Sequence, residues 1–74
     1  MRVVHQWLRG SDTTGNAFGH QARIVEEDGR YRAECIPNGM AWEPIRYWME
    51  ADTREFVRVL DMERMRQEVQ LSYL

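Results

Sequence analysis

The fold is decided by the stretch Ala22-Arg23-Ile24-Val25-Glu26-Glu27-Asp28-Gly29-Arg30-Tyr31-Arg32-Ala33-Glu34-Cys35. Asp28-Gly29 in its middle is typical of a tight hairpin turn, because both central positions of that turn need a positive φ. Counting outward from the turn pairs Glu27 with Arg30, Val25 with Arg32 and Arg23 with Glu34 on one face, and Glu26 with Tyr31, Ile24 with Ala33 and Ala22 with Cys35 on the other. Opposite charges meet on the first face and small apolar residues on the second. Turn chemistry, charge and polarity therefore agree on one antiparallel hairpin.

A third strand is predicted before this hairpin. Val3 to Leu8 is rich in β-branched and aromatic residues. The residues from Gly10 to Gly19 are mostly glycine and polar turn formers, which predicts a long loop between the two strands. Pro37-Asn38-Gly39 is expected to end the last strand of the hairpin.

The C-terminal part of the chain predicts a helix. Asp52 and Glu55 resemble an Asp variant of the capping box, which would start a helix at Thr53. Apolar residues continue beyond it at helical spacing, so we predict one helix from Thr53 to about Leu71. The predicted fold class is α+β, in which a small three-stranded antiparallel sheet (β-β-β-α) carries the C-terminal helix on one face.

Residues 44–60 allow a second interpretation. Pro44 suits a first helical position, which predicts a short helical turn before the main helix. Residues 45–49 and 56–60 are, however, equally rich in strand formers, and would form an extra hairpin that turns at 51–53. In that arrangement Asp61 caps a shorter helix. The two interpretations stay open at this level.

Length and cysteine content limit what the chain can be. A chain of 74 residues predicts a single domain spanning residues 1–74. Cys35 is the one cysteine, so no intramolecular disulfide forms, and a reducing, cytoplasmic compartment is expected. No stretch has the length of apolar residues that a secretory signal or a membrane span needs, so we expect no membrane partner.

The charges are dense and nearly balanced, with ten cations against twelve anions. This balance argues against the basic stripe of a dedicated duplex-DNA binder. Every cation is arginine and lysine is absent. Codon bias in a GC-rich genome is one explanation, and a need for the planar guanidinium in carboxylate, phosphate or aromatic contacts is the other.

The strongest candidates for metal binding or nucleophilic catalysis are His5, His20 and Cys35. None of them lies in a metal-ligand pattern such as CxxC or HExxH. Cys35 with His20 is the one conceivable nucleophile and base, yet Cys35 falls on the apolar face of the hairpin, which favours a structural thiol. We therefore expect no metal, no cofactor and no catalytic residue, and a protein that is not an enzyme.

Binding is the function that remains. Tyr, Trp and Arg are enriched at interface hot spots, and a domain this small cannot bury all its rings. The predicted partner-binding residues are Arg23, Glu26, Glu27, Asp28, Arg32, Trp42, Trp48, Glu50, Asp52 and Glu55. The carboxylates among them suit a basic protein surface that normally holds nucleic acid. We expect a small protein-binding module that inhibits or modulates a larger, nucleic-acid-handling protein assembly.

A small chain from a GC-rich genome, with many aromatic residues and no catalytic residue, suggests an accessory protein of a phage or mobile element, such as an inhibitor of a CRISPR or restriction system. This assignment rests on expectations about genomes and not on individual residues. One alternative is that the exposed rings form a homodimer contact. The other is a small nucleic-acid-binding regulator that uses its arginines and aromatic residues.

Overall fold

The computed structural model describes residues 1–10, 20–37 and 39–72. Its elements are β1 (Arg2–Arg9), β2 (His20–Glu27), β3 (Arg30–Cys35), β4 (Glu43–Pro44) and α1 (Glu50–Ser72). The strands form one antiparallel sheet in the order β1-β2-β3-β4. The predicted α+β class is confirmed, with four strands within the described residues where three were predicted. The loop predicted between Gly10 and Gly19 lies, apart from Gly10 itself, outside the described residues.

The hairpin of β2 and β3 has the predicted register at every pair, from Ala22 opposite Cys35 to Glu27 opposite Arg30. Asp28 and Gly29 both have positive φ, at 55° and 78°. The Glu26 carboxylate accepts a hydrogen bond from the backbone N–H of Gly29 at 3.0 Å. That N–H, followed by the guanidinium of Arg2, lowers the pKa of Glu26. Local chemistry therefore closes this turn.

The helical turn predicted near Pro44 is wrong, because the chain pairs with β3 there. Pro44 lies opposite Glu34, and Glu43 lies opposite Cys35. The backbone N–H of Ile45 then donates to the carbonyl of Ala33 at 3.2 Å. Proline lacks a donor, but an edge strand tolerates that loss.

Helix α1 begins at Glu50, before the predicted start at Thr53. Asp52 is the third helical residue, and its carboxylate accepts the backbone N–H of Met49 at 3.0 Å. This is the half of a capping box in which the third residue reaches back to the residue before the helix. The alternative hairpin is wrong, since residues 56–60 lie inside α1.

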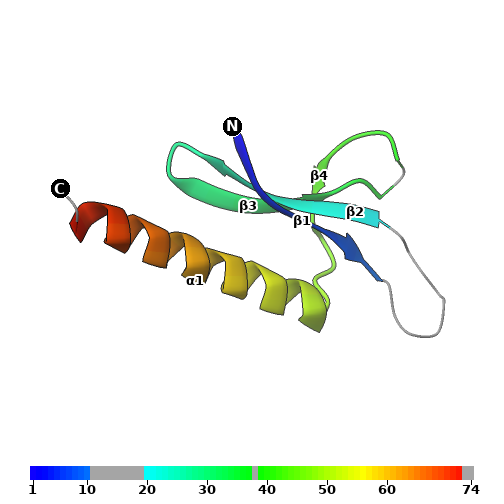
Figure 1. Cartoon of the computed structure of the whole chain (residues 1–74). Helices are drawn as coiled ribbons and strands as arrows, with labels where there is room; N and C mark the ends of the chain where they lie inside the picture. The colour runs from blue at the N-terminus through cyan, green and yellow to red at the C-terminus, as the bar shows by residue number, and fades with distance from the viewer. Residues whose placement is uncertain (11–19, 38, 73–74) are drawn as a thin grey trace.

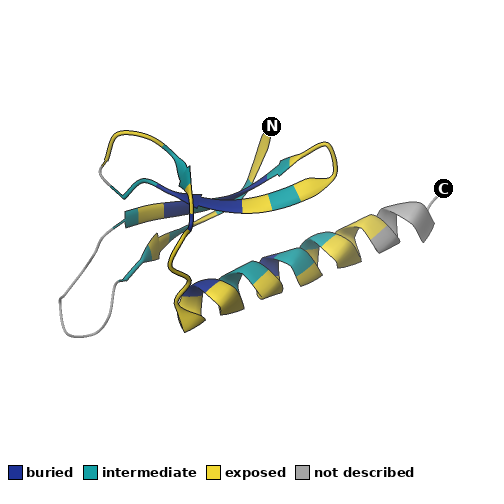
Figure 2. Cartoon of the chain, turned by 180° about the vertical axis from the view of Figure 1, so that it is seen from behind, coloured by how far each residue is buried: buried dark blue, intermediate teal, exposed yellow. Residues whose placement is uncertain are grey.

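Helix α1 lies along one face of the sheet, which we call the inner face (Figure 1). The core consists of Ala22, Ile24, Ala33, Cys35, Ile45 and Val59, with Val4, Trp7, Tyr31 and Phe56 packed against it. Figure 2 shows the buried positions gathered in the two central strands and on the side of the helix that faces them. No described element covers the opposite, outer face as the helix covers the inner one. Among the described helical residues, none forms a segment apolar and long enough to cross a bilayer.

Candidate protein-binding surface

Contacts between basic side chains and carboxylates join β1 to α1 along their seam. Arg2 binds Glu63 at 3.3 Å, His5 binds Glu55 at 2.8 Å, and Arg9 binds Asp52 at 3.0 Å. All three basic side chains come from β1, and all three carboxylates come from the sheet-facing side of α1. The helix is thus held on the sheet by charge as well as by apolar contact.

Asp52 is the most buried member of this seam, with 1% of its surface exposed. Its carboxylate accepts hydrogen bonds from Trp7 Nε1 at 3.1 Å, from Arg9 Nε at 3.0 Å and from the backbone N–H of Met49 at 3.0 Å. A buried carboxylate is stable only when charge and hydrogen bonds compensate it, and here both are supplied. Asp52 therefore fixes the start of α1 against β1.

Arg9 extends the same network into the linker between β4 and α1. One of its terminal nitrogens donates to the carbonyl oxygen of Tyr47, and the other donates to Cys35 Sγ at 3.7 Å. The guanidinium therefore connects Asp52 on the helix with β3 and with the linker backbone. Sequence reasoning gave Arg9 only a general cationic role, because its partners are far away in the chain.

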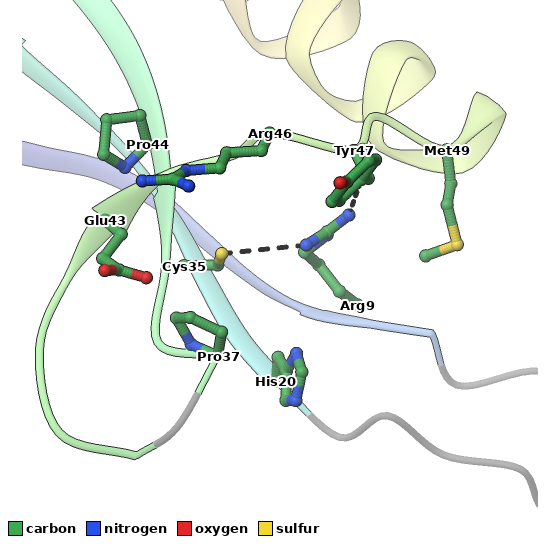
Figure 3. A pocket seen from close by; sticks show the side chains of 9 residues that line it. All are labelled: Arg9, His20, Cys35, Pro37, Glu43, Pro44, Arg46, Tyr47 and Met49. Atoms are coloured by element: carbon green, nitrogen blue, oxygen red, sulfur yellow. Dashed lines mark hydrogen bonds between the residues drawn. The ribbon is translucent and has the colours of Figure 1, made fainter.

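Beside this network lies a cavity of about 540 Å³, which we call the linker pocket (Figure 3). It is lined by Arg9, His20, Cys35, Pro37, Glu43, Pro44, Arg46, Tyr47 and Met49. Arg9, His20 and Cys35 belong to β1, β2 and β3. The pocket thus occupies the end of the inner face, next to the first turn of α1.

The linker presents exposed apolar side chains beside this pocket. Arg46, Tyr47, Trp48 and Met49 are four consecutive exposed residues, which we call the linker surface. Tyr47 is 85% exposed, and Trp48 makes an edge-to-face contact with Phe56 at 5.5 Å between ring centroids. Of these four residues the sequence predicted only Trp48 as partner-binding. The signal that was available is a run of aromatic and Met residues directly before a helix start.

His20 and Cys35, the candidate base and nucleophile, do line the same pocket. Cys35 is 4% exposed, and its sulfur accepts the hydrogen bond from Arg9. His5 lies elsewhere, paired with Glu55 and stacked on Trp7 with the ring centroids 5.9 Å apart. Within residues 1–10, 20–37 and 39–72, no three His, Cys, Asp or Glu side chains gather in a way that could hold a metal ion.

The predicted cations Arg23 and Arg32 lie on the outer face of the sheet and share one carboxylate. Glu34 binds Arg23 at 2.9 Å and Arg32 at 3.1 Å. The guanidinium of Arg23 also stacks over Trp42, 4.0 Å from the ring centroid. These side chains are largely engaged with one another, which leaves little net positive field on this face.

The predicted carboxylates do not form one surface. Glu26, Glu27 and Asp28 lie at the β2–β3 turn, whereas Glu50, Asp52 and Glu55 lie in the first turns of α1, at the other end of the molecule (Figure 1). Glu26, Asp52 and Glu55 contact other residues of the chain. Glu27, Asp28 and Glu50 are the exposed carboxylates among these six.

Glu55 should contribute an acid-sensitive part of the stability. Its carboxylate accepts Arg58 Nη2 at 2.9 Å and meets His5 Nε2 at 2.8 Å, and these two contacts lower the pKa of Glu55. A carboxyl whose pKa is lower in the folded chain stabilises it above the unfolded pKa, and the effect is lost as pH falls through the folded pKa. Glu55→Gln should therefore lower the urea midpoint at pH 7 and flatten its decline toward pH 3.

The change is expected to stay below about 1 kcal/mol, because Glu55 is partly exposed and solvent screens the pair. Glu50→Gln is the matched control, since Glu50 is an exposed carboxylate of the same helix. If the urea midpoint of Glu55→Gln varied with pH as that of the unchanged chain does, the contacts of Glu55 would contribute no pH-dependent stability.

The linker surface thus places exposed apolar side chains directly beside a mostly apolar cavity, the linker pocket. The side chains of the seam and of the outer face mainly contact one another within the chain. The predicted carboxylates are divided between the β2–β3 turn and the first turns of α1, which lie far apart. No protein-family model, curated protein or solved structure matches this chain, so the function is inferred from these residues themselves.

Proposed function

We propose that this chain is a non-catalytic protein-binding module that docks on its partner through the linker surface. By covering a surface of that partner, it inhibits or modulates a larger protein assembly. The observation that carries the proposal is the run of four exposed residues, Arg46 to Met49, beside a mostly apolar pocket. Tyr, Trp and Arg supply most of the binding energy at protein interfaces, and Met adds adaptable apolar contact.

The linker holds these side chains in place through its backbone. Ile45 is buried and its N–H donates to β3, the Tyr47 carbonyl accepts from Arg9, and the Met49 N–H donates to Asp52. A segment fixed at three successive points loses little conformational entropy when a partner binds. The buried pair of Arg9 and Asp52 therefore has a role in binding, since it pre-organises the exposed rings.

Nucleic-acid binding is supported less well. The arginines on the outer face that were candidates for phosphate contacts share Glu34, and Trp42 is already stacked by Arg23. A binder of single strands combines a positive groove with free aromatic platforms. On the described part of the outer face, the candidate arginines and the Trp42 ring are already engaged with other residues of the chain.

A capture experiment tests the proposal. The full chain is immobilised, exposed to a lysate of the source cells, and compared with Tyr47→Ala and with Val57→Ala. Tyr47→Ala should retain about tenfold less partner, because losing an aromatic hot spot costs at least that much affinity. Val57→Ala should capture as much as the unchanged chain, because Val57 lies outside the linker on α1.

Equal capture by Tyr47→Ala and the unchanged chain would contradict docking through the linker. A parallel titration with random single-stranded DNA should show no binding at low salt. Binding that weakens steeply with added salt would favour the nucleic-acid regulator instead.

A further inference from the structure

We infer that the linker pocket receives one aromatic side chain of the partner, with a carboxylate residue next to it in the partner's chain. This inference rests on the proposed function and deepens it by naming the chemistry of the partner. The occupant of the pocket is thus a segment of the partner protein.

The size and walls of the pocket fit a ring. Its volume of about 540 Å³ lies within the range of pockets that enclose ligands, roughly 300–1,000 Å³. Pro37, Pro44, Tyr47 and Met49 supply apolar walls, with Cys35 among them (Figure 3). Flat proline and tyrosine faces and the adaptable Met side chain are the surroundings in which an aromatic ring packs well.

Arg9 lines the pocket, and its guanidinium is already occupied, which disfavours a polar anchor beside it. Arg9 donates through Nε to Asp52 and through its terminal nitrogens to Cys35 and the Tyr47 carbonyl. A polar side chain that entered next to Arg9 would lose its water and gain no hydrogen bond from this guanidinium. An aromatic side chain gains apolar contact without that cost.

Arg46 selects the charge beside the ring. It is exposed and has no hydrogen bond or ion pair within the described residues. Its side chain extends along the upper rim toward Pro44 (Figure 3). The guanidinium of Arg9, in contrast, is balanced by buried Asp52. A carboxylate next to the anchor can therefore approach Arg46.

Glu43 also lines the pocket and limits how many carboxylates the partner segment can carry beside the ring. A run of several carboxylates in the partner would place one of them against Glu43. A single carboxylate beside the ring meets Arg46 and avoids that repulsion. The preference should be several-fold, the size expected of an exposed ion pair.

Short peptides test this directly on the full chain. The acetylated, amidated tripeptides Glu-Trp-Gly, Lys-Trp-Gly and Glu-Ala-Gly are titrated into the isotope-labelled protein and followed by amide chemical shifts. Glu-Trp-Gly should shift the amides of Cys35, Tyr47 and Met49 and bind roughly threefold to fivefold more tightly than Lys-Trp-Gly. Glu-Ala-Gly should cause no shift at these amides.

Two variants and one control separate the contribution of the ring from that of the charge. Arg46→Gln should bind both Trp peptides equally, because only the ion pair is lost, and Arg54→Gln on the exposed side of α1 should keep the preference. Tyr47→Ala should weaken both Trp peptides because it removes one wall. Absence of pocket shifts with Glu-Trp-Gly, or a charge preference that survives Arg46→Gln, would overturn the inference.

The outcomes distinguish this inference from the proposed function. Tyr47-dependent capture of a partner without any peptide binding would remove the aromatic anchor and leave the docking surface standing. Peptide binding without Tyr47-dependent capture would overturn docking through the linker, and with it the assignment of a partner side chain to the pocket. Release of the captured partner by excess Glu-Trp-Gly, but not by Glu-Ala-Gly, is the result expected if both hold.

Discussion

Asp52→Ala is expected to unfold most of the chain at room temperature. The substitution removes the acceptor of Trp7, Arg9 and the Met49 N–H at once. Removing one partner of a buried ion pair costs about 3–5 kcal/mol, because the other charge is left uncompensated. A domain below about 70–80 residues has roughly that much stability from a single core, so little folded protein should remain.

Urea unfolding followed by circular dichroism measures this loss. Asp52→Asn should fall between the unchanged chain and Asp52→Ala, because it keeps one acceptor oxygen. Glu50→Ala, in the same turn of α1 but exposed, should stay within about 0.5 kcal/mol. A loss below about 1 kcal/mol in Asp52→Ala would mean that the seam is held by apolar contact alone.

A double substitution separates the ion pair from the packing around it. Arg9→Met with Asp52→Leu removes both charges and replaces them with apolar side chains. It should be more stable than Asp52→Ala, because no buried charge is left unpaired. It should nevertheless bind the partner poorly, since Tyr47 and Met49 lose the contacts that fix their backbone.

The hairpin could be predicted from sequence because its information is local. Asp28-Gly29 sets the turn, and every pair follows by counting from it. Strand β4 could not be predicted in the same way. It pairs two residues, one of them Pro44, with β3, and its position depends on contacts made only in the folded chain.

The start of α1 was misplaced for a specific reason. An Asp before a helix and an Asp at its third position both precede an apolar stripe, and both are compatible with capping. Asp52 with Glu55 suggested the first arrangement, and the structure has the second, with Met49 before the helix. The distinction depends on which backbone N–H the carboxylate reaches.

The candidate site was predicted only in part, because sequence does not show which charges face each other. Asp52, Glu55 and Glu63 recur at helical spacing, which places them on one face of α1. The basic side chains of β1 that pair with them lie far away in the chain, so the sequence predicts Asp52 and Glu55 as partner-binding residues and gives Glu63 no role. A stripe of acidic residues at helical spacing, together with basic residues along a strand, is the pattern that could have indicated an internal seam.

Val59→Ala is expected to lower the free energy of unfolding by about 1.5–3 kcal/mol, since it removes two buried methyl groups and leaves a cavity. Val59 is 5% exposed and belongs to the core, whereas Val57, two residues earlier in the same helix, is 51% exposed. Val57→Ala should be neutral or slightly stabilising, because alanine favours helices more than valine does. Chemical unfolding of the two variants gives a matched comparison.

In a strand, residues two apart lie on the same face, so the extra hairpin considered for residues 44–60 predicts similar losses at both positions. A large loss at Val59 alone therefore requires helical geometry, in which the two side chains point in opposite directions and only one of them contacts the sheet.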